Sequence, residues 1–526
     1  MPRESDRTTS RVKTKGGAVN MRPGELKYPL IFSPYRIGKM EVKNRIKYAS
    51  TETNFNYGDG FVSEKEIAYM EAQARGGAGI VTTQGAFTDP RGEGKGYVGM
   101  MGIWDDKFIP GLKRICDVIH NYDAKAILQL MHCGRVGGIE LDYTVGPSVV
   151  KQRVPRFREP KEMTVAEIEE CIQEHIDGAR RCQEAGYDGV EISGIVGYLI
   201  SNFVSSYTNK RTDEYGGDIH GRCTMMRKIV EGIRKQVGPD FPIIIRLCGD
   251  ELLHDRGGNT PEESLEACKI AERAGIDCLS VTAGWQESAV SVISRDVPMG
   301  HWLFIAERMK KNLKVTISMA YRLFLPQIVE EAMGQGKLDV WEMCRPMIAD
   351  PFLPVKILEG REEDIIPCMA CNICLARLFR DAELCCFVRP SLGHESDPKF
   401  GFYGFGKAEQ PKKVWVIGAG IAGLQAAAIA AEKGHTVKVS EKGDHVGGQL
   451  AAAAKGPWGD EEFQRLIDYL ETRAKKFGAT IELNTAVTRE DVKKADADVV
   501  IVATGAQPGL DVKGADRPNV VSCLDV

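Results

Sequence analysis

The sequence predicts an α/β protein in which an N-terminal (β/α)8 TIM barrel is followed by a cysteine-rich loop and a partial Rossmann-like domain. Three observations support this fold: eight β-branched runs alternate with helical patterns, five cysteines crowd between Cys368 and Cys386, and a glycine motif follows a short strand pattern near residue 417. The chain has 526 residues, which exceeds the roughly 100–200 residues of one ordinary domain. We therefore expect at least two domains.

The barrel is predicted from eight runs between Tyr28 and Gly360 that are rich in β-branched residues. Amphipathic stretches such as "VAEIEECIQEHIDGARRCQEAG" separate them. The runs are, in order, "RIKYAS", "GAGIVTTQGA", "AKAILQLM", "YDGVEIS", "PIIIRLCGDE", "IDCLSVTAG", "KVTISMA" and "LDVWEMCRP". Eight strand–helix units of this length are typical of a closed parallel barrel.

The polar ends of these strands are the candidate active site, because barrels of this kind place their chemistry in the loops that follow the strands. The strand ends are Ser50–Thr53, Gln129–Arg135, Ser193–Tyr198, Arg246, Trp285–Glu287, Arg322 and Arg345.

Composition and charge exclude several function classes. The formal net charge of -4 offers no basic field for nucleic acid or an anionic membrane. No apolar run approaches the ~20 residues of a membrane span, and the first residues lack the apolar core of a secretory signal. We therefore expect a cytoplasmic metabolic protein. The expected segments are a mobile extension at 1–26, the barrel at 27–360, a cysteine segment with a linker at 361–400, and the second domain at 405–526.

The cysteine run "CMACNICLARLFRDAELCC" is the densest group of thiols in the chain. Cys368, Cys371 and Cys374 are separated by two residues each, and a fourth thiol follows at Cys385 or Cys386. A triplet with one distant cysteine favours a [4Fe-4S] cluster, whereas a four-cysteine zinc site usually divides into two pairs. Zinc and unligated thiols remain as alternatives.

The second domain is predicted from "KKVWVIGAGIAGLQAAAIAAEKGHTVKVSEK", which reads as strand, glycine turn, helix and strand. Gly418, Gly420 and Gly423 form the GxGxxG pattern, and Glu441 ends the second strand. These glycines allow a pyrophosphate to approach the helix N-terminus, and Glu441 would accept from ribose hydroxyls. One such unit is about half of a dinucleotide fold, so we expect the domain to be truncated.

Together these features resemble the Old Yellow Enzyme-like reductases that carry FMN, a [4Fe-4S] cluster and FAD, especially the 2,4-dienoyl-CoA reductase branch. The resemblance runs from "YPLIFSPYRIGKMEVKNRI" to the last residue. Its most specific markers are "GYDGVEI", "GYLISNF", "TNKRTDEYGGD", "MCRPMIADP" and the cysteine loop.

The resemblance implies which residues hold the cofactors. It places Ala49, Ser50 and Thr51 along one side of FMN, Gln129 at the pyrimidine edge, and Arg246 beside the part of the ring that becomes anionic on reduction. The implied FMN-phosphate residues are Arg322 and Arg345. The implied FAD and NAD(P)H residues are Gly418, Gly420, Gly423, Glu441 and Gln449. The implied cluster ligands are Cys368, Cys371, Cys374 and Cys386, since "CFVRP" favours Cys386 over Cys385.

The resemblance also implies that Tyr198 is the proton donor, because a phenol is protonated at neutral pH. Three positions depart from the family pattern. Ser193 and Val196 replace the pair that clamps an enone carbonyl, and Gln286 replaces a histidine that could carry a proton. Glu52 stands where the trimethylamine dehydrogenase branch has a flavin-linked cysteine, so covalent FMN is not expected.

The implied activity is an NAD(P)H-dependent flavin ene-reductase in which electrons pass from FAD through the cluster to FMN and then to an activated C=C. An unsaturated or aromatic acyl-CoA is the expected substrate class, and the basic loop Lys151–Lys161 is either a site for CoA phosphates or an ordinary solvated loop. The main alternative is an amine or similar dehydrogenase that exports electrons from FMN. A non-catalytic electron-transfer subunit is a third possibility, and a partner that donates electrons is expected if the chain is complete.

Overall fold

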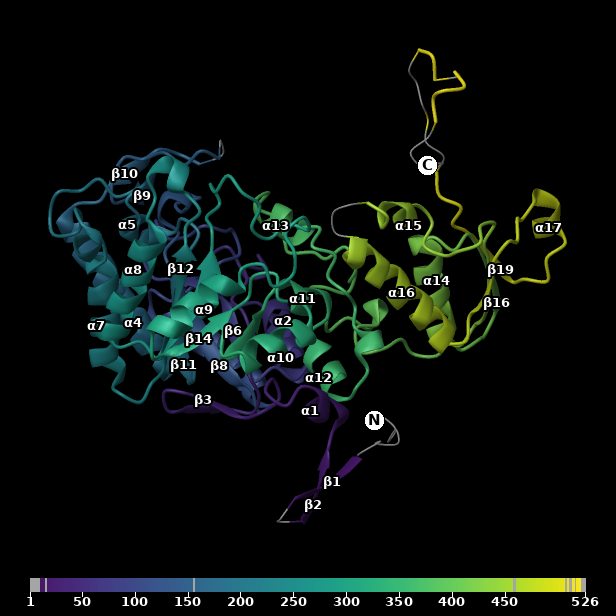
Figure 1. Ribbon diagram of the computed structural model, residues 1–526, viewed down its shortest axis with the longest axis horizontal. Helices are drawn as coiled ribbons and strands as arrows, with labels where there is room; N and C mark the ends of the chain where they lie inside the picture. Colours follow the sequence, from purple (N-terminus) through teal and green to yellow (C-terminus); the bar gives the residue numbers. More distant parts are fainter. Residues whose placement is uncertain are drawn as a thin grey trace. The chain divides into compact units, whose positions relative to one another are not determined.

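The computed structural model describes residues 10–14, 17–154, 157–456, 460–506, 509, 513–515 and 517–521. The chain divides into two compact units. One comprises Met1–Arg361 and Cys371–Glu395, and the other comprises Glu362–Ala370 and Ser396–Val526 (Figure 1). Among the described residues, the longest apolar helical stretches fall short of what a membrane crossing requires.

A closed barrel of eight parallel strands forms the centre of the first unit. The strands are β5 (Ile46–Tyr48), β6 (Ile80–Phe87), β8 (Lys125–Met131), β11 (Gly189–Gly194), β12 (Ile243–Asp250), β13 (Cys278–Ala283), β14 (Thr316–Met319) and β15 (Val340–Met343). Neighbours follow the order β5-β15-β14-β13-β12-β11-β8-β6, and pairing of β5 with β6 closes the ring. The predicted barrel and all eight predicted strands are confirmed.

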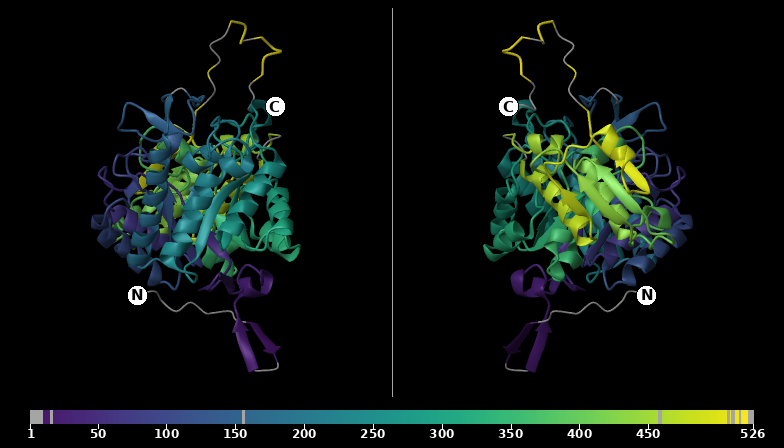
Figure 2. Two further views of the ribbon diagram at one scale, coloured as in Figure 1. Left: turned by 90° about the vertical axis from the view of Figure 1, so that its left-hand side faces the viewer. Right: turned by 90° about the vertical axis from the view of Figure 1, so that its right-hand side faces the viewer.

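Helices surround these strands, and the left-hand view of Figure 2 looks onto this outer layer. Thr164 and Thr260 start two of them with capping boxes, so that threonine and glutamate side chains satisfy the first backbone N–H groups. The helices of the first unit are α1 (Pro23–Lys27), α2 (Glu64–Arg75), α3 (Ile109–His120), α4 (Val165–Glu184), α5 (Leu199–Val204), α6 (Ile219–Arg222), α7 (Thr224–Val237), α8 (Pro261–Ala274), α9 (Leu303–Asn312), α10 (Pro326–Gly334), α11 (Arg345–Ala349), α12 (Leu353–Leu358) and α13 (Ile373–Leu378).

The first unit also contains short strands in addition to the eight strands of the barrel. Strand β7 (Met101–Gly102) pairs in parallel with the end of β6, whereas β9 (Thr144–Gly146) and β10 (Pro160–Glu162) pair within the long loop after β8. Strands β3 (Tyr35–Ile37) and β4 (Met40–Val42) form a hairpin. Within residues 1–26, strands β1 (Ser10–Thr14) and β2 (Gly17–Met21) pair antiparallel.

The second unit contains a four-stranded parallel sheet, whose yellow and yellow-green elements face the viewer in the right-hand view of Figure 2. Its order is β18 (Thr480–Glu482), β17 (Thr436–Ser440), β16 (Lys413–Ile417) and β19 (Val499–Val502). The helices of this unit are α14 (Ile421–Glu432), α15 (Gln449–Ala453), α16 (Asp460–Lys476) and α17 (Arg489–Lys493). The predicted Rossmann-like topology is confirmed.

Candidate functional site

The segment Ala49–Thr51 leaves β5 at the carboxyl end of the barrel. Ala49 is buried, Ser50 is half-buried, and the hydroxyl of Thr51 donates to the Ala49 carbonyl at 3.1 Å. The same hydroxyl lies 3.0 Å from the Cys344 thiol, at the end of β15. These bonds fix the first βα loop against its neighbour, where the sequence predicts one side of the flavin.

A buried ion cluster orients Gln129 in β8. The side-chain nitrogen of Gln129 donates to Glu191 at 2.7 Å, and Glu191 also pairs with Lys47. Lys47 bonds Glu342 at 2.9 Å, and these three charged side chains are fully buried. Because a carboxylate can only accept, Glu191 fixes the orientation of the Gln129 amide. The amide oxygen of Gln129 is then available to accept from the N–H of a bound pyrimidine edge.

Arg246 in β12 completes this group and fits the expected flavin. Its side chain is buried, one guanidinium nitrogen lies 3.4 Å from the Ser50 carbonyl, and Nε has no hydrogen-bond partner among the described residues. Burial works against the charge, but Glu342 and Glu191 outweigh it and hold the pKa of Arg246 above its usual value. A buried, charged donor with an unused N–H suits a ring that becomes anionic. FMN therefore fits this end of the barrel.

Arg322 and Arg345 both stack on one aromatic ring. Their guanidinium carbons lie 5.0 and 5.3 Å from the centre of the Phe324 ring. Arg322 has a left-handed backbone (φ 55°) and donates to the Val297 carbonyl at 2.7 Å, whereas Arg345 donates to Asn372 at 2.6 Å. The structure thus brings the two predicted phosphate residues together after β14 and β15, and it links Arg345 to the cysteine loop.

Tyr198 follows β11, and its hydroxyl lies 2.8 Å from the hydroxyl of Tyr97. Both rings are buried. Burial, followed by the nearby Tyr97 and Cys133, raises the pKa of Tyr198 well above its ordinary value. Tyr198 is therefore protonated at neutral pH, as a proton donor must be. Tyr97 is a candidate site residue that sequence reasoning missed.

Gln286 lies beside a second buried ion pair. Its side-chain oxygen accepts from Gln152 at 3.1 Å, and the next residue, Glu287, bonds Arg135 at 2.6 Å. Glu287 also accepts from the backbone N–H of Arg153 at 3.0 Å. These contacts hold the start of the basic loop against the loop after β13. Both Arg135 and Glu287 stood at predicted strand ends, but the sequence offers no signal that they pair.

Two buried carboxyl groups lie near the first βα loop: Glu52, which the sequence analysis considered only as the position of a flavin-linked cysteine, and Glu66, which it missed. Burial raises the pKa of Glu52 to about 8 and that of Glu66 to about 7. Glu52 accepts from the Gly85 N–H at 2.8 Å through one oxygen, and its other oxygen has no partner among the described residues. Glu52 is therefore largely neutral at pH 7. The sequence places Glu52 directly after Thr51 but gives no sign of its burial or of its raised pKa.

The cysteine segment Cys371–Glu395 packs on the first βα loop of the barrel. The Leu384 N–H donates to the Thr53 carbonyl at 2.8 Å, and Asn54 donates to the Ala382 carbonyl at 3.1 Å. Cys371 is exposed, and Cys374, Cys385 and Cys386 are half-buried. Cys368 belongs to the second unit, where its sulfur accepts from the Ala370 N–H at 3.4 Å. The residues after the triplet are thus held beside the segment predicted to line FMN.

The fourth cluster ligand can be identified with a matched pair of variants. We expect Cys386→Ser to abolish the cluster and Cys385→Ser to retain it, because the family pattern is met by Cys386 and both thiols are similarly buried. Iron and acid-labile sulfide assays on anaerobically purified protein measure the result. Retention of about four irons in Cys386→Ser and their loss in Cys385→Ser would reverse the assignment.

The glycine turn of the second unit fits a dinucleotide. Gly418 has φ of 104°, and a Cβ there would lie 2.4 Å from the Ala503 carbonyl oxygen. A Cβ on Gly423 would lie 1.9 Å from the Gly418 oxygen, so that only glycine allows α14 to start this close to the turn. Gly420 is the N-cap residue of α14, and a Cβ there would meet open space where a pyrophosphate can approach.

Glu441 and Gln449 surround the same turn. One oxygen of Glu441 accepts from the Ala419 N–H at 2.7 Å, and the other accepts from the Gly443 N–H at 2.9 Å. Gln449 begins α15 and donates to the Ala506 carbonyl at 2.8 Å. The structure therefore brings the five predicted dinucleotide residues together at the carboxyl end of the sheet.

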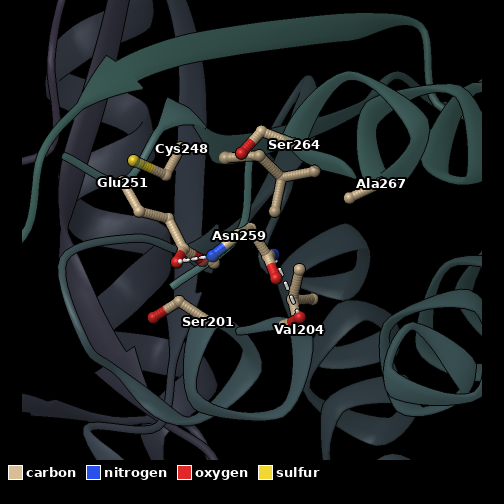
Figure 3. A pocket seen from close by; sticks show the side chains of 9 residues that line it. Ser201, Val204, Cys248, Glu251, Asn259, Ser264 and Ala267 are labelled. Carbon is tan, nitrogen blue, oxygen red and sulfur yellow. Dashed lines mark hydrogen bonds between the residues drawn. The ribbon is translucent and has the colours of Figure 1, made fainter. Parts of the chain in front are cut away.

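A small cavity lies between β12, α5 and α8, on the outer side of the barrel (Figure 3). Its volume of about 10 Å³ is the room of one water molecule. Glu251 lines it and accepts from Ser205 at 2.8 Å and from the Asn259 N–H at 2.9 Å. Burial raises the pKa of Glu251 to about 7. The cavity is too small for a substrate, but Glu251 gives the fold a pH dependence.

We expect the free energy of unfolding to fall as pH rises from about 4.5 to 7, because Glu251 binds a proton more tightly in the folded state. A shift of this size corresponds to about 3 kcal/mol. In Glu251→Gln this decline should be weaker, whereas Glu262→Gln, an exposed change in α8, which also borders the cavity, should behave as wild type. Thermal midpoints at pH 5.5 and 8 test this, and equal declines in all three proteins would contradict it.

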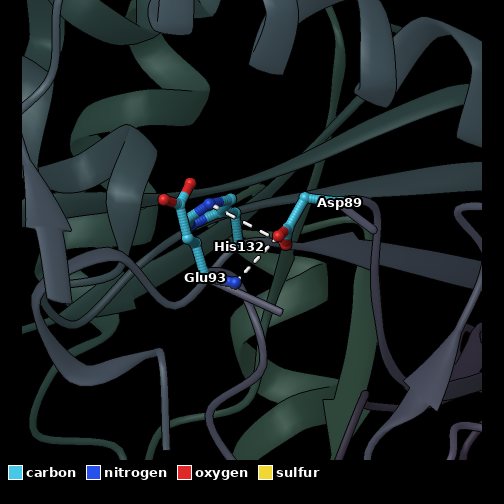
Figure 4. A group of neighbouring side chains, drawn as sticks. All are labelled: Asp89, Glu93 and His132. Carbon is cyan, nitrogen blue, oxygen red and sulfur yellow. Dashed lines mark hydrogen bonds and ion pairs between the residues drawn. The ribbon is translucent and has the colours of Figure 1, made fainter. Parts of the chain in front are cut away.

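Asp89, Glu93 and His132 form a compact buried group at the ends of β6 and β8 (Figure 4). Burial lowers the pKa of His132 to about 4, so the ring is neutral. Its Nδ1 accepts from the Gly134 N–H at 3.1 Å, which leaves the proton on Nε2, the nitrogen 4.0 Å from Asp89. A metal on Nε2 would require that proton to move to Nδ1, which would break the bond from the Gly134 N–H. The group is therefore a hydrogen-bonded clamp rather than a metal site.

Comparison with known proteins gives two family matches. The NADH:flavin oxidoreductase / NADH oxidase family matches residues 30–364, which contain the whole barrel. The NAD(P)-binding Rossmann-like domain matches residues 416–474, which contain the glycine turn.

Individual relatives extend over both units. The chain is 36% identical to the NADH oxidase of Thermoanaerobacter brockii over 94% of this chain and 75% of the relative. It is 33% identical to the cinnamate reductase of Clostridium sporogenes over 95% of this chain and 77% of the relative. A solved complex of 2-naphthoyl-CoA reductase with 2-naphthoyl-CoA has a TM-score of 0.90 and 41% identity, covering 95% of this chain and 77% of that chain.

Proposed function

The chain belongs to the NADH:flavin oxidoreductase / NADH oxidase family, and we propose that it reduces an activated C=C of an unsaturated or aromatic acyl thioester. It is an NAD(P)H-dependent flavin ene-reductase with FMN, FAD and a [4Fe-4S] cluster as cofactors. These groups, when bound, would supply a hydride acceptor for NAD(P)H, a carrier of single electrons and a hydride donor for the substrate, respectively as FAD, cluster and FMN.

The observation that carries the proposal is the buried, protonated Tyr198 at the end of the barrel that also holds Arg246 and Gln129. Hydride addition to a conjugated C=C leaves negative charge on the partner carbon, which must receive a proton. Tyr198 can supply it. Arg246 would place a fixed positive charge beside the flavin, which is the hydride donor. The amide of Gln286 can donate a hydrogen bond but cannot carry a proton near pH 7.

An acyl thioester suits this arrangement because its carbonyl accepts the developing charge. The names of two relatives, cinnamate reductase and 2-naphthoyl-CoA reductase, support conjugated aryl or alkenyl acids as the acyl part. Lys151 and Arg153 are exposed at the start of the basic loop, close to Gln286. They supply positive charge that suits the phosphates of CoA.

An amine dehydrogenase is the weaker candidate. An aromatic cage for an alkylammonium needs ring faces directed at the cation. Trp285 instead covers Gly197, where a Cβ would lie 3.3 Å from its ring, and Trp302 donates to the Val292 carbonyl at 2.9 Å. Both rings are buried and used in packing.

The test is reoxidation of the reduced holoenzyme. Anaerobic protein is reduced with one equivalent of NADH, and flavin absorbance is followed after addition of 2-naphthoyl-CoA, cinnamoyl-CoA, a 2,4-dienoyl-CoA or dimethylamine. We expect one of the thioesters to restore the oxidised spectrum and to yield a product two hydrogens heavier. Failure of all thioesters, together with reduction of the oxidised enzyme by dimethylamine, would support the amine dehydrogenase instead.

A further inference from the structure

Tyr97 is the direct partner of the candidate proton donor, although 101 positions separate the two residues. Tyr97 lies in the loop between β6 and β7, and Tyr198 precedes α5 after β11. Their hydroxyl oxygens are 2.8 Å apart, and each residue is only 6% exposed. Such a bond, removed from water, orders both hydroxyl groups.

Hydrogen bonds to the flanking backbone hold this pair from both sides. Asp89 accepts from the Glu93 N–H at 2.8 Å and from the Gly94 N–H at 2.7 Å, which fixes the loop that leads to Tyr97 (Figure 4). On the other side, the carbonyl of His132 accepts from the Leu199 N–H at 3.0 Å, directly after Tyr198. The clamp of Asp89, Glu93 and His132 therefore positions both tyrosine loops.

After it has protonated the substrate, Tyr198 must regain a proton before the next turnover. Gln286 replaces the residue that could have carried one, and an amide does not ionise near pH 7. Glu52 and Cys133 are the other titratable groups that act on Tyr198, and both raise its pKa. Burial holds the Cys133 thiol neutral by raising its pKa well above the usual value. Within the described part of the chain, Tyr97 is within hydrogen-bond distance of the Tyr198 hydroxyl, whereas Glu52 and Cys133 make no hydrogen bond to it.

We propose that Tyr97 is a positioning and proton-relay residue that acts through Tyr198, an inference that rests on the proposed ene-reductase activity. When the Tyr198 O–H is directed at the substrate, the Tyr97 hydroxyl donates to the Tyr198 oxygen. The Tyr198 O–H bond breaks as the new C–H bond forms, the Tyr97 proton moves to Tyr198, and water returns a proton to Tyr97. The overall step consumes one proton from solvent and leaves both phenols protonated.

The test compares Tyr97→Phe, Tyr198→Phe and the double variant with wild type, using the holoenzyme and the thioester that reoxidises it. Tyr187→Phe is the matched control, because it removes a buried tyrosine hydroxyl, in the loop between α4 and β11, that donates to the Leu112 carbonyl in α3. A hydrogen bond to a developing anion predicts a loss of about 10- to 100-fold in kcat for Tyr97→Phe. KM and the rate of flavin reduction by NADH should stay within about twofold, and the solvent deuterium isotope effect on kcat should increase.

The double variant distinguishes a relay from structural support. If Tyr97 acts through Tyr198, the double variant is no slower than Tyr198→Phe, because residues that act as a unit are not additive. Additive losses, or a Tyr97→Phe enzyme that matches wild type and Tyr187→Phe, would overturn the relay. If no thioester reoxidises even the wild-type enzyme, both the proposed function and the relay are wrong. That result differs from a defect that is confined to Tyr97→Phe.

Discussion

Replacing Arg246 by leucine should lower the two-electron reduction potential of bound FMN by tens of millivolts. The guanidinium is a buried cation, and its positive charge stabilises negative charge on the reduced ring. For a two-electron couple, 30 mV corresponds to about 1.4 kcal/mol, so even a modest loss of charge stabilisation is measurable. We expect kcat for the thioester to fall by roughly 100-fold, as when one stabilising donor is removed from an enzyme site.

The choice of a control variant for Arg246→Leu depends on the buried charges around Arg246. Without it, Lys47 alone faces Glu191 and Glu342, and one carboxyl group must take up a proton. Arg246→Lys keeps the charge and should retain most of the potential, whereas Arg246→Leu should not. Spectroelectrochemical titration of FMN measures both variants after flavin content has been checked. An unchanged potential in Arg246→Leu with full FMN content would contradict the assigned role.

The barrel could be predicted because its signal is local and repeated. Each of the eight runs is a short apolar strand bounded by helical periodicity, and a parallel strand buried on both faces requires that composition. The glycine turn was predictable for a related reason. At Gly418 and Gly423 a Cβ would collide with backbone atoms, so the fold requires glycine at both positions and the sequence shows it.

The contacts that complete the site cannot be recognised from the identity of the residues alone. Tyr97 and Tyr198 meet because the barrel closes, and nothing in either local sequence indicates the bond. Glu191 and Lys47 are 144 positions apart, yet their pairing determines how Gln129 presents its amide. The raised pKa of Glu52 is caused by its burial in the folded protein. Such features depend on tertiary packing, so sequence motifs do not predict them.

The cysteine segment was only partly predictable from the sequence. Spacing predicts the ligand set, but the division of the segment between two units is a tertiary property. The bond from Arg345 to Asn372 is equally non-local, and it joins a predicted phosphate residue to the stretch between Cys371 and Cys374. This bond holds the cysteine segment against the loop that follows β15.

Replacing Tyr198 by phenylalanine should separate the two halves of the reaction. Phenylalanine fills the same buried space and loses only the hydroxyl, so the fold and the loop anchored at the His132 carbonyl should persist. Flavin reduction by NADH needs no proton from Tyr198 and should proceed at the wild-type rate. Reoxidation by the thioester should slow by about 10²- to 10⁴-fold, the usual contribution of a positioned general acid.

Stopped-flow measurement of the two half-reactions decides the role of Tyr198. A general acid affects only the oxidative half-reaction, and its loss should also make the remaining rate depend on buffer acid concentration, because an external donor must replace the phenol. A residue that only shapes the pocket would instead raise KM and leave the reaction of bound substrate nearly unchanged. If Tyr198→Phe reoxidises at the wild-type rate, the proton comes from water, and the raised pKa of the tyrosine reflects burial alone.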